Sequence, residues 1–234
     1  MAQHPLVRQR GFTLIELLVA LAVMALLAIV SWRGRDGMGR AQQQTGQRGD
    51  ELLVLQAALA QWGADLDAVL PLAHTVPLDW DGQVLRITRR SSAVPDPGAL
   101  VVAWARRNVQ GQSQWLRWQS PPLRTRAQWQ QAWQQAAIWS RNPSDADQRT
   151  EVVLMPLTDW QIFYYRGGAW SNPQSSSGNN DSTTSAAEIG GSSAIPSASI
   201  PDGVRLQLEL PPGQALAGRL TRDWVNPLQG GGKS

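Results

Sequence analysis

Residues 12–32 read FTLIELLVALAVMALLAIVSW, and this stretch decides the architecture of the chain. Only Thr13, Glu16 and Ser31 are polar among its 21 residues. As an α-helix the stretch would rise about 1.5 Å per residue, which is enough to cross a hydrocarbon core of about 30 Å. The sequence therefore predicts a transmembrane helix over 12–32.

A secretory signal peptide is the alternative interpretation of the same stretch. Such a signal ends in small residues at a cleavage site. Residues 28–33 read AIVSWR, which is a poor site, and a carboxylate inside the apolar segment is unusual for a signal. We therefore expect the helix to stay with the mature protein.

Glu16 is the most informative residue of this segment. A lone carboxylate in a membrane costs about 3 kcal/mol and needs a partner, but residues 12–32 contain no Lys, Arg or His. Cleavage between Gly11 and Phe12 would create an α-amino group one helical turn before Glu16. That amine could neutralise Glu16 in the same chain or in a neighbour packed alongside; a tolerated acid near the membrane edge is the other interpretation.

Residues 10–20, RGFTLIELLVA, resemble the cleavage and methylation signal of type IV pilins and type II secretion pseudopilins. The resemblance implies that a prepilin peptidase removes the leader 1–11 by cutting after Gly11. It also implies that the peptidase N-methylates Phe12, and that Glu16 guides docking into a helical filament.

The orientation of the helix follows from this motif and not from its flanking charges. The leader carries Arg8 and Arg10, whereas the other flank carries Arg33, Arg35 and Arg40, so a count of positive residues does not place the leader inside. Because the peptidase of this family acts on the cytoplasmic side, we expect a cytoplasmic leader and a periplasmic C-terminal domain.

Residues 33–70 divide into a linker and an amphipathic helix. Glycines at 34, 37, 39, 46 and 49 each cost about 1 kcal/mol in a helix, so we expect the first part to be weakened or locally melted. From Asp50 the helix should return, and Pro71 should end it. Steps of three and four predict one apolar stripe, formed by Leu52, Leu55, Leu59, Trp62, Leu66 and Val69. The opposite face should hold Gln56, Gln61, Asp65 and Asp67.

Residues 71–228 are expected to form a β-rich domain. Short strands are predicted at 84–88, 100–105, 114–119, 152–157, 160–165 and 204–210, the last near the end of the sheet. A hairpin turn is predicted at 166–170, and Trp129 and Trp133 lie at helical spacing in a Gln-rich segment. The chain has 12 Trp against 2 Phe and 2 Tyr, so buried indole N–H groups must find acceptors.

Two segments have compositions that do not favour a packed core. Residues 173–200 consist largely of Ser, Gly, Asn, Thr and Ala, which bury too little apolar surface to offset their ordering entropy, and we expect a flexible surface insert. Residues 229–234 read QGGGKS and are expected to form a tail. Its GKS sequence is not a phosphate loop, because Pro227 stands where a glycine is required.

The sequence gives no support for catalysis, a metal or a cofactor. There is no Cys, and His74 is the only histidine after the leader, without a nucleophile motif beside it. The fragments Asp79-Trp80-Asp81-Gly82 and Asp145-Ala146-Asp147 lack the remaining ligands of a calcium loop, and we interpret them as turn residues. The net charge of +3 includes the leader residues Arg8 and Arg10, and the remaining arginines are scattered along the chain. We therefore expect no nucleic-acid partner.

The order of these pieces resembles the minor pseudopilin J class of type II secretion, and in part minor pilins of the PilW type. The resemblance rests on Trp62-x-x-Asp65-Leu66, on residues 84–89, on the hairpin ending at Trp170 and on residues 200–208. It implies an α+β, pilin-like fold, in which a long N-terminal helix, with a membrane half and an amphipathic half, packs on an antiparallel β-sheet.

The function implied by this resemblance is structural. A single-pass inner-membrane protein would join I- and K-class pseudopilins at the pseudopilus tip and help to initiate filament assembly for export across the outer membrane. The prepilin peptidase and the inner-membrane assembly platform would be its further partners. A minor pilin of a type IV pilus is the alternative.

Overall fold

A computed structural model of the chain describes residues 12–92, 98–176 and 200–227. The chain divides into two units, residues 1–49 and residues 50–234. The leader 1–11, the tail 229–234 and most of the Ser-rich insert lie outside the described residues, so the expectations for them stay predictions.

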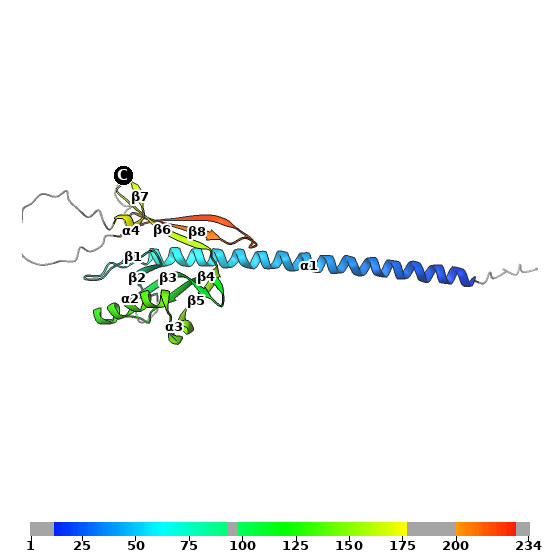
Figure 1. Cartoon of the computed structure of the whole chain (residues 1–234), viewed down its shortest axis with the longest axis horizontal. Coiled ribbons are helices and arrows are strands. Elements are labelled where there is room, and N and C mark those ends of the chain that lie inside the picture. The colour runs from blue at the N-terminus through cyan, green and yellow to red at the C-terminus, as the bar shows by residue number, and fades with distance from the viewer. Residues whose placement is uncertain (1–11, 93–97, 177–199, 228–234) are drawn as a thin grey trace, which may run out of the picture. The chain divides into compact units, whose positions relative to one another are not determined.

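The first element, α1, is a helix over Leu14–Asp67 (Figure 1). It continues through the Gly-containing segment 33–49, and the predicted local melting there is therefore wrong. A helix satisfies its backbone hydrogen bonds within the segment, and isolated glycines weaken it by about 1 kcal/mol each without breaking it. The helix ends at Asp67, four residues before Pro71, and Val69 then forms an isolated bridge with Arg89.

The first sheet is a five-stranded antiparallel meander in the order β1-β2-β3-β4-β5. Its strands are β1 (Leu78–Trp80), β2 (Val84–Arg90), β3 (Ala99–Val109), β4 (Gln112–Gln119) and β5 (Val152–Pro156). Gln110 and Gly111, with φ of 51° and 85°, join β3 to β4. Positive φ at both central residues is the geometry of a type I′ turn, which matches the twist of the two strands.

Two helices stand between β4 and β5 in the chain. They are α2 (Arg126–Arg141) and α3 (Asp145–Thr150). Thr125 begins α2 with a capping box that it forms with Gln128. One face of α2 buries Trp129, Ala136 and Trp139. Of the two tryptophans whose helical spacing was noted, Trp129 is buried and Trp133 is half-buried.

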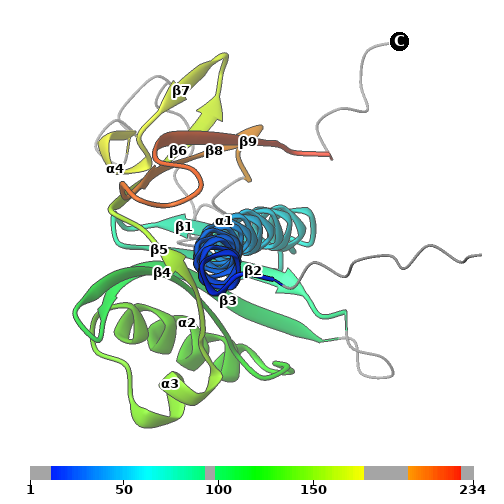
Figure 2. The same ribbon diagram turned by 90° about the vertical axis from the view of Figure 1, so that its right-hand side faces the viewer.

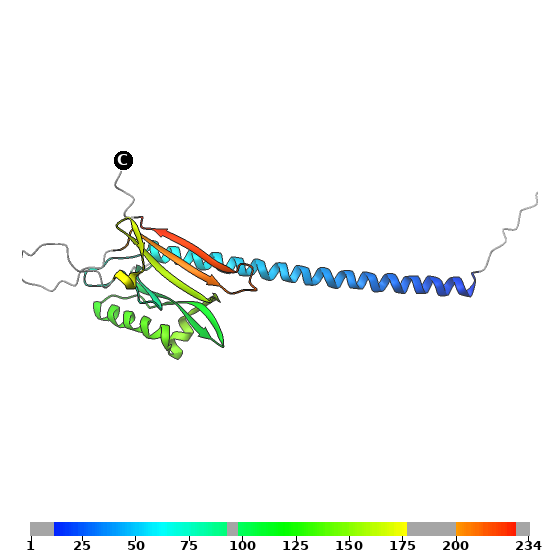
Figure 3. The same ribbon diagram turned by 45° about the horizontal axis from the view of Figure 1, so that its top comes forward.

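The second sheet has four antiparallel strands in the order β7-β6-β8-β9, and Figure 3 shows its three long strands side by side. The strands are β6 (Asp159–Arg166), β7 (Ala169–Ser171), β8 (Gly203–Leu210) and β9 (Gly218–Val225), and a short α4 (Pro173–Ser176) follows β7. The predicted hairpin at 166–170 is present, with Gly167 and Gly168 at its tip.

Two hydrophobic clusters hold the domain together. The larger cluster joins both sheets to the C-terminal part of α1, which contributes Leu55, Ala58, Trp62 and Leu66. The smaller cluster lies between the first sheet and α2. The layers are therefore second sheet, α1, first sheet and α2, and Figure 2 shows α1 end-on between the two sheets.

The α+β prediction is confirmed, with two differences from the expected arrangement. There are two sheets where one was expected. The strand β8 lies near the end of its sheet, as predicted, next to the edge strand β9. The sequence pattern also missed β1, which has three residues, and β9, an edge strand whose exposed charged side chains hide its alternation.

Indole rings dominate the core, as the composition indicated. Nine of the twelve tryptophans are buried. Four indole N–H groups donate to side-chain oxygens of the chain, those of Trp104, Trp129, Trp139 and Trp224. The buried N–H groups of Trp62 and Trp115 have no acceptor in the part of the chain that the structure describes.

Candidate assembly site

The first turn of α1 is closed by reciprocal hydrogen bonds between Thr13 and Glu16. The backbone N–H and the hydroxyl of Thr13 donate to Oε2 of Glu16 at 3.3 and 3.2 Å, and the N–H of Glu16 donates to Oγ1 of Thr13 at 3.4 Å. This is a capping box, in which the two side chains satisfy N–H groups that the first helical turn leaves unpaired. It holds the carboxylate of Glu16 at the helix end where the macrodipole is positive.

The residues predicted for processing and assembly lie at this helix end. Phe12 is exposed, and Glu16 follows it by one helical turn. Gly11 lies outside the described residues, so the cleavage stays a prediction. Phe12 lies two residues before the start of α1 and four residues before Glu16. The pairing of Glu16 with an amine at Phe12 therefore stays a prediction.

The apolar segment after this turn has the length and composition of a membrane span. Residues Leu14–Trp32 have a mean hydropathy of 2.7, and none of these residues is buried within the described part of the chain. A soluble core helix with this composition would be covered by other elements. The exposed apolar surface is therefore compatible with single-pass membrane anchoring.

A second polar centre, which the sequence pattern missed, fixes the other end of α1 in the domain. Asp65 is fully buried. The guanidinium of Arg117 donates to both of its oxygens, from Nε at 2.8 Å and from Nη2 at 2.9 Å. Arg89 forms an ion pair with Oδ1, the indole of Trp104 donates to Oδ2 at 2.9 Å, and the amide of Gln61 donates to Oδ1 at 2.9 Å.

The prediction that Asp65 faces away from the core is wrong. Asp65 follows Trp62 by three residues and precedes Val69 by four, and residues at these spacings share one face of a helix. This spacing indicated a core-facing position for Asp65. A carboxylate is nevertheless expected at the surface unless buried partners for it are known. Arg89 lies on β2 and Arg117 on β4, so only the folded sheet brings both charges to it.

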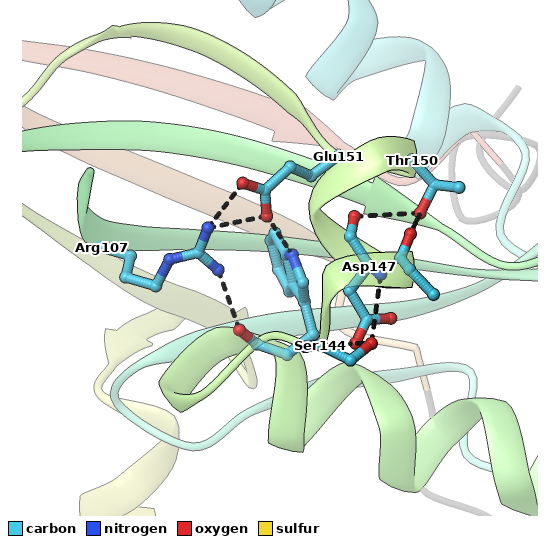
Figure 4. A network of polar contacts seen from close by, with 7 residues as sticks. Arg107, Ser144, Asp147, Thr150 and Glu151 are labelled. Atoms are coloured by element: carbon cyan, nitrogen blue, oxygen red, sulfur yellow. Dashed lines mark hydrogen bonds and ion pairs between the residues drawn. The ribbon is translucent and has the colours of Figure 1, made fainter. Parts of the chain in front are cut away.

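A third polar network joins α2 and α3 to the first sheet (Figure 4). Nη2 of Arg107, on β3, donates to both oxygens of Glu151 at 2.6 and 2.7 Å, and Nη1 donates to the carbonyl of Trp139 at 3.0 Å. The indole of Trp139 donates to Glu151 as well, at 2.7 Å. This network holds the two helices against the sheet.

The prediction that both acidic fragments are turn residues holds only for Asp81 and Gly82, which join β1 to β2. Asp79 and Trp80 belong to β1, and residues 145–147 form the first turn of α3. Asp147 accepts hydrogen bonds from the N–H and hydroxyl of Ser144 at 3.0 and 2.6 Å, at the start of α3. Asp81 accepts the N–H groups of Gln83 and Val84. His74 is exposed in the loop before β1, with a φ of 60°. Within the ranges that the structure describes, no three His, Cys, Asp or Glu side chains are grouped as a metal site.

Comparisons with known proteins find one sequence motif and one relative. Residues 6–32 match the prokaryotic N-terminal methylation motif, a stretch that includes Gly11, Phe12 and Glu16. Over 64 residues the chain is 33% identical to type II secretion system protein J of Klebsiella pneumoniae, an alignment that covers 27% of this chain and 32% of that protein. The chain therefore spans about a third of the length of the relative it matches. Together the two matches support a pilin-like protein that resembles the J pseudopilins.

Proposed function

We propose that this chain is a minor pseudopilin of a type II secretion system, a structural subunit of the pseudopilus tip that helps to initiate filament assembly for protein export across the outer membrane. The observation that carries the proposal is the match of residues 6–32 to the methylation motif. Within that match, residues Leu14–Trp32 form an exposed apolar helix, whose first turn holds Glu16. The similarity to the Klebsiella protein J favours the secretion system over other pilin-like assemblies.

The assembly step follows from the charges in the first turn. Prepilin peptidase would cut after Gly11 and methylate the new amine of Phe12, which stays protonated. Both hydrogen bonds from Thr13 reach one carboxylate oxygen of Glu16. A protonated amine from the same chain or from a neighbouring subunit would then supply the counter-charge that a carboxylate in lipid requires.

The two units of the chain have different tasks in this scheme. The apolar helix would lie in the inner membrane and pack against the helices of other subunits. The β-rich domain would lie in the periplasm and present the surface that recognises I- and K-class pseudopilins, with the assembly platform as a further partner. The role is structural and not catalytic.

Mass spectrometry of the protein from its native host tests the processing step. We expect a mature chain that begins with N-methylated Phe12. A chain that retains residues 1–11 would refute the proposal.

Replacement of Glu16 tests the assembly step. We expect Glu16→Ala to abolish incorporation into filaments while the thermal unfolding of the β-rich domain is unchanged, because Glu16 lies outside that domain. Thr13→Val removes the hydroxyl of the capping box but keeps the carboxylate, and it should assemble. Normal assembly of Glu16→Ala would contradict the proposed charge pairing.

Co-purification separates the two filament systems. Recovery of the protein with I- and K-class pseudopilins is the expected result. Recovery with a major pilin in their place would overturn the secretion assignment and identify a minor pilin of a type IV pilus.

A further inference from the structure

A largely apolar hollow of about 210 Å³ lies where the domain part of α1, the strand β5 and the loop between β8 and β9 meet. Leu52 and Val54 line it from α1, Leu154 and Met155 from β5, and Leu216 from the loop. We refer to this hollow as the Leu52–Leu216 groove. A dry cavity of about 150 Å³ holds a benzene molecule, so the groove has room for one large apolar side chain.

Exposed apolar residues of the domain gather on the segments that form this groove. In the described part of residues 50–227, nine large apolar side chains are exposed. Six of them belong to these segments: Leu52, Leu53, Val54, Val152, Val153 and Leu216. Three of these six, Leu52, Val54 and Leu216, line the groove itself. Single exposed apolar residues are common on soluble domains, but several of them at one hollow mark a contact surface.

The rim of the groove carries negative charge. Asp50 and Glu51 stand on α1 at its edge, and none of the described residues that line it is Lys or Arg. Oε2 of Glu51 accepts the N–H of Ala215 at 2.6 Å, which holds the β8–β9 loop in place as one wall. A partner that buries an apolar side chain here would therefore be favoured if it carried basic residues beside that side chain.

The shape of the groove favours a helix over a strand. One wall is the surface of α1, on which Asp50 and Val54, and likewise Glu51 and Leu55, are four residues apart. Such rows of side chains form the furrows into which the ridges of a second helix pack. The α1 wall has no row of free backbone N–H and C=O groups, which an added strand would need. Among the described walls of the groove only β5, the edge strand of the first sheet, has an unpaired edge.

We propose that the Leu52–Leu216 groove receives an apolar side chain from a basic amphipathic helix of a neighbouring pilin-like subunit. The inference rests on the proposed function, because a filament tip is the setting that supplies such a neighbour. It adds to that function the location of the docking surface and the chemistry of the partner.

A peptide probe tests the chemistry of the groove. The probe is a fluorescent helical peptide with Leu at positions i, i+3, i+4 and i+7 and Arg elsewhere, titrated against the full-length protein in detergent. A charge-reversed twin with Glu in place of Arg is the matched ligand. We expect the basic peptide to bind about tenfold or more tightly than its twin.

Three variants locate the binding site of the peptide. Val54→Arg and Leu216→Arg place a positive charge in the groove, at side chains that are 41% and 44% exposed, and should weaken binding about tenfold or more. Val225→Arg, on β9 outside the groove, is the control and should bind as the parent does. Equal affinity for both peptides, equal affinity of all variants, or no binding at all would overturn the proposal.

A second experiment identifies the neighbour in assembled membranes. The chain contains no Cys, so Leu216→Cys provides a unique thiol for a photoactivatable crosslinker. We expect an adduct on an apolar residue of another pilin-like subunit's helix, beside a Lys or Arg, and none from Val225→Cys. If that adduct is absent from samples whose chain begins with methylated Phe12, the groove is not the docking site, and the proposed function still stands. If the chain retains residues 1–11, the proposed function itself is refuted.

Discussion

Asp65 is the residue whose replacement should damage the domain most. Its carboxylate is fully buried and accepts from two guanidinium groups, an indole and an amide. Asp65→Ala would leave the side chains of Arg89 and Arg117, which are 10% and 12% exposed, without their counter-charge. Two largely buried cations in one site repel each other, and the neutral acceptors that remain, the carbonyl of Arg90 and the amide oxygen of Gln119, supply no counter-charge.

The size of the effect follows from this geometry. Removing one partner of a buried ion pair costs about 3–5 kcal/mol, out of a total domain stability of about 5–15 kcal/mol. For a domain of this size each kcal/mol lowers Tm by about 2–4 °C, so we expect a fall of roughly 6–20 °C. Urea denaturation of the full chain in detergent, followed by tryptophan fluorescence, measures the free energy of unfolding directly.

Non-additivity makes the test sharper. The variant Asp65→Ala with Arg89→Met and Arg117→Met removes the whole charge cluster, and it should be more stable than Asp65→Ala alone, because no uncompensated charge remains. Asp67→Ala is the matched control: it removes an exposed carboxylate that accepts from Trp224 at 2.7 Å, and it should cost about 1 kcal/mol. A cost for Asp65→Ala below about 1 kcal/mol would refute the reasoning.

Two further predictions concern other ion pairs of the domain. Glu151→Ala should lower the free energy of unfolding by about 3 kcal/mol, because the side chain of Arg107 is 14% exposed and would lose its counter-charge; Glu151→Gln keeps an acceptor and should cost less, as urea denaturation would show. On the second sheet, Arg205 donates to both oxygens of Asp223 at 2.7 Å and lowers the pKa of that carboxyl below its ordinary 3.8. The pair therefore stabilises the domain at neutral pH, and this contribution is lost as the pH falls through the lowered pKa. The difference in Tm between parent and Asp223→Asn should vanish in acid, and a constant difference down to pH 2 would count against the assignment.

Most strands and helices of the domain could be predicted from the sequence, because their signals are local. The alternation in β8 and the helical spacing of Trp129 and Trp133 in α2 are set within one element. The strand β9 could not be predicted in this way, since an edge strand with exposed charges lacks a clear alternation. The continuity of α1 through its glycines was not predicted either. Helix propensity treats each glycine alone, whereas a long helix extends cooperatively, with one backbone hydrogen bond for each added residue.

The candidate sites show the same division. The Thr13–Glu16 turn and the apolar segment after it are properties of consecutive residues, so the sequence alone determined the predicted membrane anchor and the position of its acid. The burial of Asp65 and the Leu52–Leu216 groove were decided only by tertiary structure. The physical reason is that their energies depend on groups far apart in the chain, such as the charges of β2 and β4 around one carboxylate, which only the packing of α1 between two sheets brings together.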